Sequence, residues 1–124
     1  MSYNNPYEYL SGKLENKKLI NAGFSEKTYD TGTVKLNYVV GPKNGPSLLL
    51  IPAQMGMWES YKKVLIPLSK IFKVYSIDIR GHGKSTWTPG YYSWKIVDGD
   101  LKMFIENVIR SEEHTSELQS HVMI

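Results

Sequence analysis

Apolar and polar positions alternate along residues 24–30 and 33–40, two runs rich in β-branched and aromatic side chains that are separated by Thr31-Gly32. A period of two predicts strands with one buried face, and a short turn between two such runs predicts an antiparallel hairpin. Residues 47–51 lack this alternation, because they are apolar at nearly every position. Such a run predicts a strand that is buried on both faces.

The pattern then changes to a helical period. Residues 58–71 place apolar side chains three and four positions apart, with lysines on the other side and Pro67 near the end, which predicts an amphipathic helix. Residues 73–79 predict another strand, and residues 93–109 predict a second amphipathic helix with Ser93 as its N-cap. A helix that connects two strands predicts that those strands run parallel.

The order of these elements predicts an α/β fold class. We expect an antiparallel hairpin followed by strand, helix, strand and helix, which together form part of an incomplete mixed sheet. Residues 5–18 predict a further helix in a region that Gly23 ends. We therefore divide the chain into an N-terminal extension that is partly helical (1–23), an α/β region (24–109) and a tail (110–124).

The tail differs from the rest of the chain. Its sequence RSEEHTSELQSH, from Arg110 to His121, is polar and follows neither hydrophobic period. Residues 110–120 also match, over eleven consecutive positions, the translation of a common sequencing adapter. We interpret residues 110–124 as a non-native tail and infer no function from them.

The composition is that of a folded protein, with 41% hydrophobic and 22% charged residues. No apolar run approaches the roughly 20 residues of a membrane span, and the first residues lack the features of a signal peptide. We therefore expect a cytoplasmic protein with no membrane partner. The net charge of +3 is not gathered into a basic run or stripe, so we expect no nucleic-acid partner.

Cofactor and metal chemistry find no support in the sequence. The absence of cysteine excludes disulfides and thiolate metal sites. Outside the tail, His82 is the only histidine, and the carboxylates are scattered without the spacing of metal ligands. We expect neither a metal nor a cofactor, and we interpret His82 as a surface turn residue.

Two segments carry a resemblance to a known family: LNYVVGPKNGPSLLLIPAQMGMWESY and KVYSIDIRGHGKST. Together they are similar to the opening part of proteins of the α/β-hydrolase fold family, and the similarity covers about residues 24–109. In that family a strand ends in Asp-x-Arg-Gly-x-Gly-x-Ser, and this chain has the matching residues Asp78, Arg80, Gly81, Gly83 and Ser85. The resemblance implies a structural role for them, in which the two charged groups fix a sharp turn and the glycines supply positive φ angles.

The same stretch also resembles the end of a phosphate-binding loop, because Gly83-Lys84-Ser85 fits the final residues of G-x-x-x-x-G-K-[ST]. The first glycine of that motif would fall at Asp78, and residues 86–90 predict a loop where the motif requires a helix. We therefore do not expect nucleotide binding.

The loop after the strand at 47–51 is where hydrolases of this fold place a backbone N–H that stabilises the oxyanion. The family commonly has His-Gly there, whereas this chain has Pro52-Ala53. The resemblance makes the backbone N–H of Gln54 the candidate oxyanion donor. The neighbouring side chains are candidates for an acyl pocket or for core packing: Met55, Met57 and Trp58.

The groups that perform hydrolysis in the family have no counterpart in this sequence. It contains no G-x-S-x-G, and no acid and histidine follow in the family's order. The resemblance places the nucleophile strand after the helix that ends near Ile109, beside residues 48–51. We therefore expect that helix to lead to no strand, the edge at 48–51 to be bare, and this fragment to be inactive.

Three functions remain open for the parent protein. The leading hypothesis is hydrolysis of a small ester or related acyl substrate through a nucleophile, histidine and acid triad. A second is other chemistry on the same fold, as in dehalogenases, epoxide hydrolases or peroxidases, because a fold does not determine a reaction. A third is a non-enzymatic ligand-binding protein. The sequence determines neither the substrate nor the oligomeric state.

Overall fold

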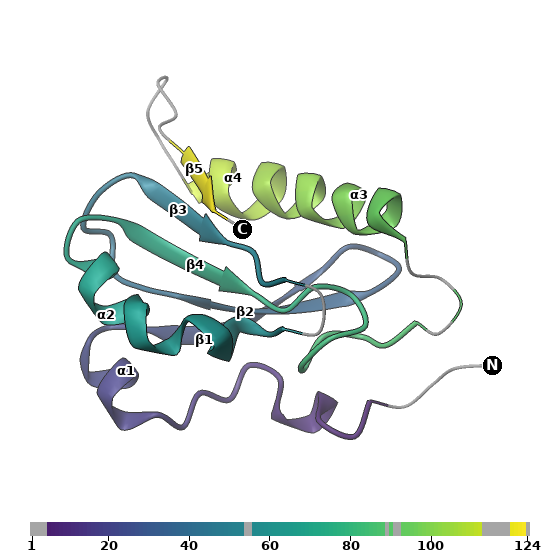
Figure 1. The fold of residues 1–124 in the computed structure, drawn as a ribbon, viewed down its shortest axis with the longest axis horizontal. Coiled ribbons are helices and arrows are strands. Elements are labelled where there is room, and N and C mark those ends of the chain that lie inside the picture. Colours follow the sequence, from purple (N-terminus) through teal and green to yellow (C-terminus); the bar gives the residue numbers. More distant parts are fainter. Residues whose placement is uncertain (1–4, 54–55, 89, 91–92, 113–119, 124) are drawn as a thin grey trace.

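The computed structural model describes residues 5–53, 56–88, 90, 93–112 and 120–123. Its strands form one mixed sheet in the order β1-β2-β4-β3-β5, with helices on both faces (Figure 1). The strands are β1 (Ser25–Asp30), β2 (Lys35–Val40), β3 (Ser47–Leu50), β4 (Lys73–Ile77) and β5 (Ser120–Met123). The helical elements are η1 (Glu8–Leu10), α1 (Lys17–Asn21), η2 (Trp58–Tyr61), α2 (Lys62–Ser69), α3 (Trp94–Phe104), the π-helical η3 (Ile105–Ile109) and α4 (Arg110–Glu112). The predicted α/β class is confirmed.

The predicted hairpin and the predicted parallel pair are both present. Strands β1 and β2 pair antiparallel from Ser25 opposite Val40 to Asp30 opposite Lys35, across a turn in which Gly32 has a φ of 99°. Strand β2 continues the sheet by pairing antiparallel with β4. Strands β3 and β4 are parallel, so their carboxyl ends, and the loops that follow them, lie at the same edge of the sheet.

Strand β3 is buried along its whole length because helices cover both faces of the sheet (Figure 1). Leu49 packs on the α3 face, in a cluster with Phe104. Leu48 and Leu50 point the other way and pack on the α2 face, in a cluster with Leu65. Each fully buried leucine contributes roughly 2 kcal/mol through the apolar surface it removes from water. This explains why residues 47–51 are apolar without alternation.

The two predicted amphipathic helices are present with small differences. The segment at 58–71 begins as the 3₁₀ segment η2, continues as α2 and ends at Ser69, with Pro67 inside the helix. Helix α3 begins at the predicted N-cap, because the Ser93 hydroxyl accepts a hydrogen bond from the Ile96 N–H at 3.3 Å. From Ile105 the helix widens into a π-helical turn.

The predicted helix at 5–18 is wrong. Only the three-residue η1 forms there, and α1 begins at Lys17, after Asn16 caps it by accepting a hydrogen bond from the Leu19 N–H. The break lies at Gly12, which has a φ of 76° and donates its N–H to the side chain of Asn37 at 3.0 Å. A hydrogen bond to a distant strand thus replaces the helical one, which local periodicity could not indicate.

The expectation of a bare edge at 48–51 is also wrong, as is the expectation that the last helix leads to no strand. Strand β5 pairs parallel with β3, from Ser47 opposite Ser120 to Leu50 opposite Met123. Figure 1 shows β5 at the end of the sheet, beside β3. Backbone pairing requires only free N–H and C=O groups on the edge strand, so a segment without hydrophobic periodicity can form the neighbouring strand.

The start of the tail is also joined to the sheet. The Glu112 carboxylate accepts hydrogen bonds from the Lys73 ammonium at 2.6 Å and from the Tyr75 hydroxyl at 2.7 Å. Burial opposes ionisation of Glu112, but these two bonds and the charge of Lys73 outweigh it, so the pKa of Glu112 is lowered. The interpretation of residues 110–124 as non-native stays a prediction.

Candidate active-site loops

The candidate site lies where β3 and β4 end, because the two strands are parallel and their following loops are neighbours. After β3 the Gly56 N–H donates a hydrogen bond to the Ala53 carbonyl at 2.8 Å. Gln54, the candidate oxyanion donor, and Met55 lie outside the described residues. Met57 is 38% exposed.

Trp58 packs in the core on the α2 face, with only 4% of its surface exposed. Its backbone N–H donates to Asp78 Oδ1 at 2.7 Å, which fastens the end of the loop after β3 to the end of β4. The sequence left two roles open for Trp58, in an acyl pocket or in core packing. The structure shows Trp58 packed in the core. Its predicted role in an acyl pocket stays a prediction.

Asp78 is the centre of the site. Its carboxylate is 1% exposed and accepts three hydrogen bonds, from the N–H groups of Trp58 and Lys84 and from the side-chain amide of Asn37. These donors come from three separate segments, so one carboxylate joins the two loops to β2. Burial raises the pKa of Asp78, and the nearby charge of Glu26 acts in the same direction, although the three hydrogen bonds oppose the shift.

The glycines of this loop adopt the predicted backbone. Gly81 and Gly83 have φ angles of 81° and 53°. A Cβ on Gly83 would lie 2.5 Å from the carboxylate of Asp78, so the loop can close around that side chain only without one. Ser85 is fully buried; its hydroxyl donates to the Asp78 carbonyl at 2.6 Å and accepts from the Asn37 N–H at 2.8 Å.

Arg80 has a partner that the sequence analysis did not identify. Its guanidinium forms a bidentate ion pair with Asp100 of α3, through Nε at 2.8 Å and Nη2 at 2.9 Å. Both side chains are nearly buried, at 10% and 7% exposure. The pair therefore joins the loop after β4 to the helix that covers one face of the sheet.

A second missed group continues the network outward from Asp78. Asn37 also donates to Glu26 at 2.6 Å, and Glu26 forms an ion pair with the Lys84 ammonium at 3.0 Å. Glu26 is a fully buried carboxylate on an edge strand. The sequence held a signal for it, since Glu26 has the same parity as Phe24 and should face the core side of its strand.

The described loops contain no free nucleophile with a base beside it. Ser85, the buried hydroxyl of the motif, has both its hydrogen bonds within the fold. The Lys84 ammonium donates to Glu26, and residues 86–88 form the predicted loop. His82 is half-buried, with Nδ1 3.1 Å from the Arg80 carbonyl.

Within the described ranges, no three histidine or carboxylate side chains are grouped so that they could hold a metal ion. No helix among those ranges has the length and apolar character needed to cross a bilayer.

No protein-family model and no curated protein matches the sequence. Solved structures do match. The Cif epoxide hydrolase from Acinetobacter nosocomialis is 22% identical, with a TM-score of 0.69, over 98% of this chain and 39% of its own. A membrane phospholipase A is 20% identical, with a TM-score of 0.68, over 85% of this chain and 33% of its own. A deformylase from Pseudomonas putida S16 is 26% identical, with a TM-score of 0.62, over 66% of this chain and 32% of its own.

This chain therefore spans between about a third and two fifths of the length of these proteins. The chain has the fold of the N-terminal part of an α/β-hydrolase-fold protein.

Proposed function

We propose that this chain is the N-terminal part of a hydrolase whose catalytic triad lies outside it, and that the whole protein cleaves a small ester or related acyl compound. One observation carries the proposal: Asp78 joins the loop after β3 to the loop after β4. In this fold the first of those loops supplies an oxyanion donor, and a donor is effective only when it is held rigidly in place.

The role of each site residue follows from that arrangement. The backbone N–H of Gln54 would donate to the developing oxyanion, and Trp58 would fix the loop through its bond to Asp78. Met55, Met57 and the indole of Trp58 would contact the acyl part of the substrate. The chain alone would be inactive, because it supplies no nucleophile. We further propose a cytoplasmic protein acting on a small molecule, without a nucleic-acid or membrane partner.

A second candidate is epoxide opening on the same fold. It is supported by the similarity to the Acinetobacter nosocomialis epoxide hydrolase, which covers almost the whole of this chain. The two candidates differ in the nucleophile, since serine favours ester chemistry and aspartate favours the opening of an epoxide.

The test is to sequence the source locus across the codon for Ile109, express the complete reading frame and assay it with p-nitrophenyl acetate and with styrene oxide. We expect the frame to encode a G-x-S-x-G strand-to-helix turn and the protein to hydrolyse the ester. Turnover of styrene oxide alone, with aspartate at that turn, would support the second candidate. A frame that stops at Ile124, or a complete protein with no turnover, would refute both.

The oxyanion role of Gln54 can be tested separately in that complete protein. Gln54→Pro removes the backbone N–H and should lower kcat by about 10²-fold or more, because that is the usual effect of losing one oxyanion donor. Gln54→Ala retains the N–H and serves as the matched control, with kcat unchanged. Equal losses in two variants of equal thermal stability would show that the N–H is not the functional group.

A further inference from the structure

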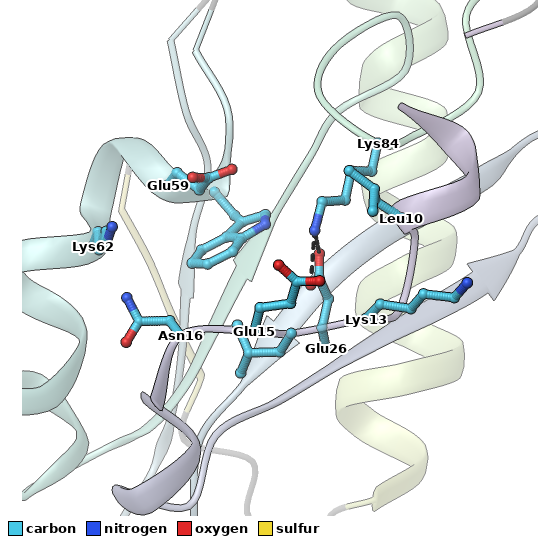
Figure 2. Close-up of a pocket in the computed structure, with 10 residues that line it drawn as sticks. Leu10, Lys13, Glu15, Asn16, Glu26, Glu59, Lys62 and Lys84 are labelled. Atoms are coloured by element: carbon cyan, nitrogen blue, oxygen red, sulfur yellow. Dashed lines mark hydrogen bonds and ion pairs between the residues drawn. The ribbon is translucent and has the colours of Figure 1, made fainter. Parts of the chain in front are cut away.

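A pocket of about 400 Å³ lies on the α2 face, between the N-terminal segment that precedes α1 and the segment η2. Figure 2 shows side chains of both segments around it, with Glu26 and Lys84 between them. We call it the N-terminal pocket. Its volume is that of a small-molecule site. The pocket shares Trp58 with the proposed acyl site, but its other lining residues belong to neither the loop after β3 nor the catalytic triad, so its ligand can be tested separately from the proposed function.

The inner wall of the pocket carries hydrogen-bond donors. The indole Nε1 of Trp58 is buried and has no hydrogen-bond partner among the described residues. The Lys84 ammonium has three hydrogens, and its described bonds both go to the carboxylate of Glu26. An unsatisfied buried donor costs about 1 to 3 kcal/mol, so a ligand oxygen that accepts from this wall would be favoured.

The rim of the pocket carries charges of both signs. Glu15 and Glu59 lie on opposite segments, and neither carboxylate forms an ion pair in the described structure. Lys62 adds a further exposed ammonium on the η2 side. Because Glu26 and Lys84 neutralise each other, the pocket favours neither a simple anion nor a simple cation. It suits a ligand that carries both charges.

The remaining wall is apolar. Leu10 and Leu14 contribute half-buried side chains, and Trp58 also lines the pocket. A ligand with an aliphatic side chain would remove this surface from water, at roughly 0.8 kcal/mol for each buried CH₂ group. The pocket thus combines donors for a carboxylate, carboxylates for an ammonium group, and an apolar surface.

We propose that the N-terminal pocket binds a small zwitterion with an aliphatic side chain, of the α-amino-acid type. The ligand carboxylate accepts from the indole of Trp58 and from Lys84, and its ammonium group lies between Glu15 and Glu59. The aliphatic side chain contacts Leu10 and Leu14.

The test is titration of the full 124-residue chain with L-leucine, followed by calorimetry and by the indole N–H resonance of Trp58, which Trp58→Phe assigns. We expect saturable binding between about 0.1 and 10 mM. Isocaproate lacks the ammonium group and isoamylamine lacks the carboxylate, so each should bind at least about tenfold more weakly. Absence of saturation in this range, or equal binding of either analogue, would overturn the proposal.

A matched pair of surface variants keeps the test independent of folding. Glu59→Gln removes one rim carboxylate and should weaken leucine binding by about tenfold. Glu106→Gln makes the same change on η3, outside the pocket, and should leave the affinity unchanged. Equal affinities for the two variants would show that Glu59 does not contact the ligand and would contradict the assigned geometry.

Discussion

At the scale of single residues, the site depends on how closely the backbone approaches the buried carboxylate of Asp78. Gly83 has a positive φ, and its backbone lies where a Cβ would overlap that carboxylate. Asp78 cannot move aside easily, because three hydrogen bonds from separate segments hold it. The glycine is therefore required for two reasons at once, backbone conformation and space.

We expect Gly83→Ala to lower the free energy of unfolding by about 3 kcal/mol or more, since it adds a steric overlap to an unfavourable backbone conformation. Gly32→Ala is the matched control: its φ is also positive but its Cβ would meet no atom within 4 Å, so it should cost only about 1 to 2 kcal/mol. Urea unfolding measures both. Equal costs would show that the approach to Asp78 is not restrictive.

At the scale of elements, the pair between Arg80 and Asp100 holds α3 against the loop after β4. Both charges are almost removed from water, and the guanidinium is bound in a bidentate geometry. Such a pair is costly to break because the remaining partner stays buried without its counter-charge. The pair thus links the helix on one face of the sheet to the loop that surrounds Asp78.

Asp100→Asn should lower the free energy of unfolding by about 3 kcal/mol or more, because it leaves Arg80 buried and uncompensated. Asp98→Asn makes the same change two residues earlier, on the opposite side of α3. Asp98 pairs with Lys102, and these two side chains are 61% and 76% exposed, so the change should cost less than about 0.5 kcal/mol. Thermal and urea unfolding report the difference. Similar small losses would mean that the buried pair contributes little.

At the scale of the whole molecule, the C-terminal part of the chain extends the sheet by one strand and binds to it through a side chain. Strand β5 pairs with the edge of β3, and Glu112 at the end of α4 binds Lys73 and Tyr75 of β4. Because the pKa of Glu112 is lowered, its ionised form favours the folded state. That contribution is fully present above the ordinary pKa of 4.5 and is lost as the pH falls through the lower folded value.

We therefore expect the difference in unfolding free energy between the chain and Glu112→Gln to be largest near pH 7 and to shrink as the pH falls below 4.5, the ordinary pKa of the glutamate. Asp78 acts in the opposite direction, since its raised pKa makes the folded state lose stability as the pH rises above 3.8, but this contribution is common to both proteins and cancels. Urea unfolding across this range measures the difference. A difference that is independent of pH would contradict the assignment to Glu112.

The sequence by itself determined the order and type of most elements between residues 24 and 109. The hairpin, the buried β3, the parallel β4 and the N-cap of α3 all follow from periodicity and turn residues, which act over a few neighbouring positions. The resemblance added the loop motif, and its glycines have the expected φ angles. These features are local, so the chain specifies them before it folds.

Only the tertiary structure decided how distant segments are joined. The partner of Arg80 lies 20 residues away, Asn37 reaches Asp78 across 41 residues, and the Gly12 N–H donates to Asn37 across 25 residues. Strand β5 joins the sheet although its sequence has no hydrophobic pattern. The edge strand β3 offers unpaired backbone N–H and C=O groups, and any extended segment can form hydrogen bonds with them. Such contacts depend on which buried polar groups must be satisfied, and that requirement exists only once the fold has removed them from water.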